Sequence, residues 1–133
     1  MKIGIDTNIL VYYLDVKSPF HKDIKRKLDK LIMENRAVVT PQNFIELSSV
    51  LTKKEVTPEI IEEIVQTISR LFVIVCPDEN TLTKFFELLK TYPRRGVKVF
   101  DLFLVATFLS HHIHTIYSYN TKDFQDIKEI NLY

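Results

Sequence analysis

Short apolar runs alternate along the chain with longer segments in which apolar residues recur every three or four positions. The runs have the length and β-branched content of buried strands and cover residues 2–5, 37–40, 72–75 and 115–118, with 130–132 as the candidate for a fifth, edge strand. The longer segments are typical of helices and cover residues 9–14, 20–32, 41–51, 58–71, 77–91 and 99–113. The last segment is apolar on nearly every side, which indicates cover from both the sheet and neighbouring helices.

Strands that alternate with helices through the whole chain predict a parallel sheet between helix layers. The expected fold class is α/β, a three-layer α/β/α sandwich around a central parallel sheet of about five strands. We expect one domain over residues 1–133. Ligands of such folds bind beyond the carboxyl ends of the strands, where the strand order reverses, and Asp6, Ser118 and Asn120 lie at such ends.

The amino-acid composition mainly excludes classes of protein that differ from an ordinary globular domain. The hydrophobic share of 46% and the charged share of 26% are those of an ordinary globular protein. Lysine and arginine total 18 against 17 for aspartate and glutamate, so any contact with nucleic acid must come from a local patch. The longest uncharged apolar run, residues 102–109, is too short to span a bilayer as a helix, and we expect no membrane association.

Cys76 is the only cysteine of the chain. It excludes an internal disulfide and a cysteine-based zinc site, and it suits a reducing compartment. The first residues reach Asp6 before an apolar stretch of signal-peptide length develops. We therefore expect a cytoplasmic protein in which Cys76 is a small core residue.

Four acidic residues stand where an acid is locally unexpected. Asp6 ends the first strand, Glu46 lies between two apolar residues of a helix, Asp101 lies in the most apolar helix, and Asp123 lies in the last turn. Each has an ordinary alternative. Asp6 would serve as a helix N-cap, worth about 1 kcal/mol, and Glu46 would face solvent.

Asp101 is the hardest of these acids to explain by structure alone. A carboxylate on an apolar helix is costly to bury without a partner or a metal, and the alternative is an ion pair with Arg94, Arg95 or Lys98. Two carboxylates about 5 Å apart repel by roughly 3 kcal/mol at an effective dielectric constant near 20, so a cluster needs protons or cations. Ligation by oxygen alone favours Mg²⁺ or Mn²⁺ over zinc.

The acids fall within four blocks of sequence. The blocks are Ile5-Asp6-Thr7-Asn8 followed by Leu10, Pro41-Gln42-Asn43-Phe44-Ile45-Glu46, Arg95-Gly96 before Phe100-Asp101 with Ala106, and Ser118-Tyr119-Asn120-Thr121-Lys122-Asp123-Phe124. Asp-Thr-Asn alone is a weak signal, but four blocks in this order and at these distances are specific. The chain resembles the PIN domains, and especially the small prokaryotic members of the VapC toxin type, from Ile3 to Phe124.

The resemblance implies a metal-dependent endoribonuclease that hydrolyses RNA phosphodiesters with Mg²⁺ or Mn²⁺. Asp6 and Asp101 would be the central metal ligands, and Glu46 would be a further acidic member, directly or through water. Thr7 or Asn8 would help to position a ligand or phosphate.

The fourth acidic role in the family is held by the residue matching either Asn120 or Asp123. We favour Asp123, with Asn120 in support. The chain departs from the family pattern at Leu102, where a small residue is frequent, and at residues 111–114, where three histidines replace a frequent glycine. A solvated helix C-terminus accounts for these histidines better than a metal site.

Basic and aromatic residues supply the candidates for RNA contact. Arg94, Arg95 and Lys98, near Asp101, would contact the phosphate backbone. The basic residues between 22 and 30 are better explained as a solvated helix face. Tyr12 and Tyr13 would stack on bases or, more in keeping with a first helix, belong to the core or to a dimer contact.

Several functions share this chemistry. The resemblance implies the toxin of a toxin–antitoxin pair, with an antitoxin protein as partner and a homodimer as the assembly. The alternatives are a housekeeping RNA-processing nuclease and a catalytically weak module that binds RNA or protein. Phosphatases that form an aspartyl-phosphate resemble Asp-x-Asp-x-Thr after the first strand, and the chain lacks the second acid of that motif, since Asn8 stands there.

Overall fold

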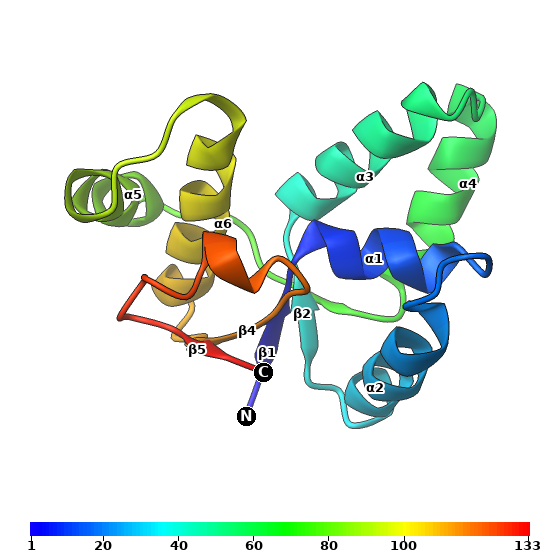
Figure 1. Ribbon diagram of the computed structural model, residues 1–133, viewed down its shortest axis with the longest axis horizontal. Coiled ribbons are helices and arrows are strands. Elements are labelled where there is room, and N and C mark those ends of the chain that lie inside the picture. Colours follow the sequence, from blue (N-terminus) through cyan, green and yellow to red (C-terminus); the bar gives the residue numbers. More distant parts are fainter.

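Helices cover both faces of a five-stranded parallel sheet in the computed structural model, which describes residues 1–133 (Figure 1). The strands are β1 (Ile3–Ile5), β2 (Ala37–Val39), β3 (Val73–Ile74), β4 (Thr115–Tyr117) and β5 (Asn131–Leu132). The helices are α1 (Thr7–Leu14), α2 (His21–Met33), α3 (Pro41–Lys53), α4 (Pro58–Ser69), α5 (Thr81–Thr91) and α6 (Val99–Ser110), with 3₁₀ turns η1 (Gly96–Lys98) and η2 (Thr121–Asp123). The predicted three-layer α/β/α fold with five parallel strands is confirmed.

The strand order β3-β2-β1-β4-β5 reverses at β1. The chain moves outward from β1 through β2 to β3, and then crosses to the other side of β1 to form β4 and β5. The carboxyl ends of β1 and β4 are therefore neighbours, and the Asp6 N–H donates a 3.0 Å hydrogen bond to the Tyr117 carbonyl oxygen. This reversal is where ligands bind in open α/β sheets.

Alternate residues of the strands divide the core into two halves. Ile3, Ile5 and Val39 pack against α1 to α4 on one face, while Val38 and Ile116 pack against α5 and α6 on the other. Figure 1 shows the two helix groups on opposite sides of the sheet. The near-continuous apolar character of the strands follows from this double cover.

Gly4 allows α6 to pack directly on β1. A Cβ at this position would lie 2.7 Å from the ring of Phe108, which is closer than van der Waals contact allows. Phe108 is itself fully buried in the last turn of α6. The glycine of β1 thus sets how closely the most apolar helix approaches the sheet.

Three differences from the predicted element boundaries have a clear local cause. β3 has two residues because only Val73 and Ile74 pair with β2. α5 begins at Thr81, since the Asp78 carboxylate accepts the Asn80 N–H at 2.8 Å and forms a turn where a helix start was expected.

The third difference lies at the end of α6, which stops at Ser110 and not near Ile113. His112 adopts a left-handed backbone with φ of 59°. The N–H of Ile113 then bonds back to the Phe108 carbonyl oxygen at 3.0 Å, which caps the helix in a Schellman motif.

The expectation for Cys76 was wrong. Its side chain is exposed, because residue 76 follows the end of the edge strand β3, where the chain leaves the sheet toward α5. None of the helices combines the length and apolarity that crossing a bilayer requires.

Candidate acidic active site

Asp6 lies where β1 ends and α1 begins, and it is both a helix N-cap and a member of the acidic site. Its Oδ1 accepts the Thr7 N–H at 2.8 Å, and its Oδ2 accepts a 2.7 Å hydrogen bond from the Ser118 hydroxyl. The residue is only 6% exposed. Asp6 can therefore cap α1 and belong to the acidic site at once, because α1 begins at the end of β1, where the strand order reverses.

Glu46 faces the site and not bulk solvent. The Thr7 hydroxyl donates to Glu46 Oε1 at 2.6 Å, so the third helix is linked to the start of the first. Asn43 secures this contact: its Nδ2 donates to Thr7 Oγ1 at 3.1 Å and to the Ile5 carbonyl oxygen at 2.9 Å, while its Oδ1 accepts the Thr40 N–H at 2.8 Å. A fully buried asparagine thus places the glutamate beside Asp6.

Asp101 lies in the first turn of α6, half-buried, and takes part in no ion pair and no side-chain hydrogen bond. The alternative of an ion pair with a nearby cation is wrong. Lys98 Nζ lies 3.0 Å from Asp123 Oδ1, and Arg94 lies 2.7 Å from Asp126 Oδ1. Arg95 is exposed and has no ion-pair partner.

The carboxylates act on one another electrostatically. Burial raises the pKa of Asp101 to about 7, together with the negative charges of Asp6, Asp123 and Glu46, while Lys98 opposes the shift. Burial also raises the pKa of Asp6 to about 6 against the hydrogen bonds from Ser118 and Thr7, and Glu46 and Asp123 add to the rise. Strongly raised carboxyl pKa values at a strand-order reversal indicate a functional site.

The donor chemistry of this site fits a hard divalent cation. The four side chains offer only carboxylate oxygens, which suit Mg²⁺ and Mn²⁺. Burial first, and the neighbouring acids second, raise the pKa values of Asp6 and Asp101, and a bound cation would stabilise the ionised forms that both effects disfavour. No three acidic, histidine or cysteine side chains converge as a ready-made metal centre. The acids are electrostatic neighbours, so joint ligation would require some side chains to rotate.

The last block places its two candidates differently. Asp123 lies half-buried in η2 and contributes to the raised pKa values of Asp6 and Asp101. Asn120 is exposed, and its backbone N–H donates to Ser118 Oγ at 2.9 Å. Asn8, half-buried on α1, has no side-chain hydrogen bond.

Three residues of this region were not among the expected site residues. Ser118 and Asn43 hold Asp6 and Thr7, and Gln42 Nε2 donates to the Phe100 carbonyl oxygen at 2.8 Å, next to Asp101. All three lie within the sequence blocks that carry the acids. Ser118 had been placed at a strand end where ligands bind, and the position of Gln42 and Asn43 just after the second strand was the signal that could have identified them.

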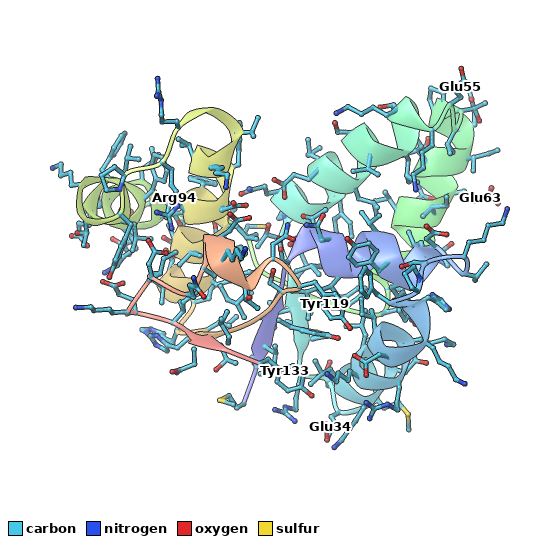
Figure 2. All side chains as sticks on the ribbon, in the orientation of Figure 1. Glu34, Glu55, Glu63, Arg94, Tyr119 and Tyr133 are labelled. Carbon is cyan, nitrogen blue, oxygen red and sulfur yellow. The ribbon has the colours of Figure 1, made fainter.

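The candidates for RNA contact are not equally available. The Arg94 side chain is 13% exposed and also donates to the Asp123 carbonyl oxygen at 3.2 Å, so it links the loop before η1 to the segment after η2. Lys98 is 60% exposed despite its partner. Figure 2 shows Arg94 on the α5 and α6 side of the molecule.

The other basic and aromatic groups have local partners. Lys25, Arg26 and Lys27 form ion pairs within α2, as expected of a solvated face. The Tyr13 hydroxyl donates to Asp29 at 2.6 Å, and Tyr12 packs partly buried against the core. The histidines after α6 remain near the surface, and His111 is hydrogen-bonded to the Cys76 carbonyl oxygen at 2.6 Å.

An α/β/α fold with acids from β1, α3, α6 and η2 at one strand-order reversal defines the class to which this protein belongs. The model of the PIN domain family matches residues 3–130, and the chain is a member of that family. The resemblance seen in the sequence is therefore confirmed.

Known relatives agree with this assignment. Ribonuclease VapC1 of Methanocaldococcus jannaschii is 25% identical over 98% of this chain and 85% of its own length. VapBC2 from Rickettsia felis, bound to a DNA fragment from its promoter, is similar with a TM-score of 0.78 and 18% identity over 100% of this chain and 98% of the other. VapBC-1 from nontypeable Haemophilus influenzae has a TM-score of 0.76 and 20% identity over 100% and 97%. At these identities the structures show a shared fold.

Proposed function

We propose that this chain is an endoribonuclease that hydrolyses RNA phosphodiesters and depends on Mg²⁺ or Mn²⁺. One observation carries the proposal: acids from four elements gather at the strand-order reversal, where Ser118 and Thr7 hold the carboxylates of Asp6 and Glu46. The pKa values of Asp6 and Asp101, raised to about 6 and about 7 by burial and by the neighbouring acids, agree with this arrangement. The relative named a ribonuclease supports RNA as the substrate.

Asp6 and Asp101 would hold the metal, with Glu46 and Asp123 as further acidic members. A divalent cation bound there would lower the pKa of a water molecule and neutralise negative charge on the phosphodiester. Ser118 and the Thr7 N–H hold the Asp6 carboxylate in one orientation, and the Thr7 hydroxyl does the same for Glu46. These bonds fix the carboxylates of Asp6 and Glu46, whereas Asp101, which has no side-chain hydrogen bond, can rotate toward a cation.

Cleavage of defined RNAs with and without Mg²⁺ or Mn²⁺ tests this proposal. We expect metal-dependent cuts that EDTA prevents and that Asp6→Asn and Asp101→Asn each abolish. Glu87→Gln is the control, because Glu87 is an exposed acid on α5 whose carboxylate pairs with Lys84, on an element that carries none of the four acids. Identical cleavage by wild type and Asp101→Asn would reveal a contaminating nuclease and contradict the proposal.

We further propose that the nuclease is the toxin of a toxin–antitoxin pair, with an antitoxin protein as partner. Support comes from solved relatives described as VapBC proteins and, from Klebsiella pneumoniae, as a toxin-antitoxin complex. A short upstream gene whose product copurifies with the chain and blocks cleavage is the expected result. Its absence would favour a housekeeping role in RNA processing.

We propose that residues 1–133 form a single nuclease domain and that the protein is cytoplasmic, where RNA is available.

We also propose that the chain forms a homodimer. Support for the dimer comes from Ile45, Val97 and Phe100, large apolar side chains that are exposed around one hollow of about 330 Å³ between α3 and the start of α6. Light scattering of wild type and Phe100→Glu tests it. A monomeric wild type would contradict the dimer.

A further inference from the structure

A hollow of about 460 Å³ lies directly beside the acidic site, lined by Lys98, Tyr119, Asn120, Thr121, Lys122 and Asp123. Asp123 belongs both to this lining and to the acidic cluster. The Asn120 N–H is held by the Ser118 hydroxyl, which also binds Asp6. A molecule in the hollow would therefore continue directly into the carboxylate site.

The hollow has cationic side chains available to a ligand. Lys122 is exposed and forms no ion pair, and Lys98 is 60% exposed although it pairs with Asp123. Arg94, by contrast, is largely buried in its contacts with Asp126 and the Asp123 carbonyl oxygen. The cations that line the hollow are therefore Lys122 of η2, which is unpaired, and the exposed Lys98 of η1, whereas the unpaired Arg95 is not part of its lining.

Tyr119 is the aromatic residue that lines this hollow, and Phe20 packs against its ring. The ring of Tyr119 lies 5.1 Å from that of Phe20 in an edge-to-face arrangement and 6.0 Å from that of Tyr12. The Tyr119 hydroxyl donates to Asp23 at 2.9 Å, which fixes the ring, and Figure 2 shows Tyr119 directed toward the α1 and α2 side. Phe20 is 42% exposed although its neighbours hold it in place. We call Phe20 and Tyr119 the aromatic ledge.

We propose that the hollow and the aromatic ledge bind one nucleotide of single-stranded RNA next to the scissile phosphate. Lys122 and Lys98 contact the backbone phosphate, and the base stacks on the exposed ring of Phe20, which the edge-to-face contact with Tyr119 holds in place. Immobilised rings beside exposed lysines are the combination that binds single strands, because every base has a face to stack and every nucleotide has a phosphate. The inference rests on the proposed nuclease function and specifies how its substrate lies.

The binding of RNA without cleavage tests this inference. Fluorescence anisotropy of a short labelled single-stranded RNA is measured in EDTA at about 50 mM salt, where electrostatic contacts are strong. We expect Phe20→Ala to raise the Kd about tenfold, the usual effect of removing one stacking partner. Lys122→Ala should raise the Kd several-fold and reduce the salt slope by about 1.

Matched controls lie on α5, on the other side of the sheet. Leu82→Ala removes an exposed apolar side chain, and Lys90→Ala removes an exposed lysine of the last turn. Both should leave the Kd unchanged. A 2-aminopurine base in the RNA should be quenched by wild type and not by Phe20→Ala, and duplex RNA should bind more weakly than the single strand.

Each outcome decides the inference. An unchanged Kd for both Phe20→Ala and Lys122→Ala, equal losses in the α5 controls, or no RNA binding by wild type would overturn it. Lys122→Ala keeps the test valid if Phe20→Ala unfolds, because Lys122 is exposed. If the wild type cleaves RNA with metal but Phe20→Ala and Lys122→Ala leave the Kd unchanged, the nucleotide subsite is wrong and the nuclease proposal stands. If both variants raise the Kd but no RNA is cleaved, the nuclease proposal is wrong and the binding of RNA at this hollow stands.

Discussion

The hydroxyl of Ser118 donates a 2.7 Å hydrogen bond to Oδ2 of Asp6 and so joins the carboxyl ends of β4 and β1. The two residues are 112 positions apart in the chain and meet only because the strand order reverses between these strands. The bond stabilises the ionised form of the buried Asp6 carboxylate, so it lowers the pKa of Asp6, whereas burial raises it.

We expect Ser118→Ala to lower the free energy of unfolding by about 1.5–3 kcal/mol at pH 8, since a hydrogen bond to a charged group is lost. The pKa of Asp6 should rise further above 6. Urea unfolding in EDTA measures the first effect and NMR titration the second. Ser48→Ala, which removes only a bond to Phe44 within α3, is the control and should change stability little.

Asp101→Asn should stabilise the metal-free protein at pH 8 by about 1–2 kcal/mol, after allowance for partial exposure. The folded pKa of about 7 lies above the ordinary value of 3.8, so the folded state binds the proton more tightly. Stability from this group is present below pH 3.8 and is lost as the pH rises through 7.

Urea unfolding between pH 4 and 8 in EDTA measures this slope, which Asp101→Asn should flatten. Asp126→Asn is the control of opposite sign, because the hydrogen bond from Arg94 holds the pKa of Asp126 below its usual value. That variant should lose stability at pH 8. A pH slope that Asp101→Asn leaves unchanged would contradict the assignment.

Gln42 joins α3 and α6, which belong to the helix layers on opposite faces of the sheet. Its Nε2 donates to the Phe100 carbonyl oxygen at 2.8 Å, and no other hydrogen bond joins α3 and α6. Because Glu46 and Asp101 lie on these two helices, we expect Gln42→Ala to lower kcat about tenfold or more with little change in KM, as small misplacements of catalytic groups do. Gln66→Ala on α4, where the side chain contacts only Glu62, is the control. Equal kinetics for both variants would contradict a positioning role.

Gly4→Ala should destabilise the fold by about 1–3 kcal/mol, because the added methyl group overpacks the contact between β1 and α6. Phe108→Leu in the same chain should recover part of the loss by shortening the side chain that clashes. Thermal unfolding of the single and double variants measures this coupling. Additive losses would show that the strain lies elsewhere.

The sequence by itself determined the fold class and the acids. Apolar periodicity is a local property, so it predicted the alternation of strands and helices and their parallel arrangement. Asp101 was identified because a carboxylate on an apolar helix is costly to bury without a partner or a metal, and Asp6 because it follows the first strand within the block that resembles the PIN domains. Boundaries were less accurate where side chains decide them, as Asp78 does before α5 and the backbone of His112 does after α6.

Only the tertiary structure decided which groups meet. Whether Asp101 pairs with a cation depends on distances between elements. In the structure Lys98 forms its ion pair with Asp123 and Arg94 with Asp126, so neither pairs with Asp101. Cys76 is exposed because β3 is an edge strand, and strand order cannot be read from a run of apolar residues. Ser118 and Asp6 come together for the same reason: long-range pairing is set by the packing of the whole sheet, whereas sequence patterns report on neighbours along the chain.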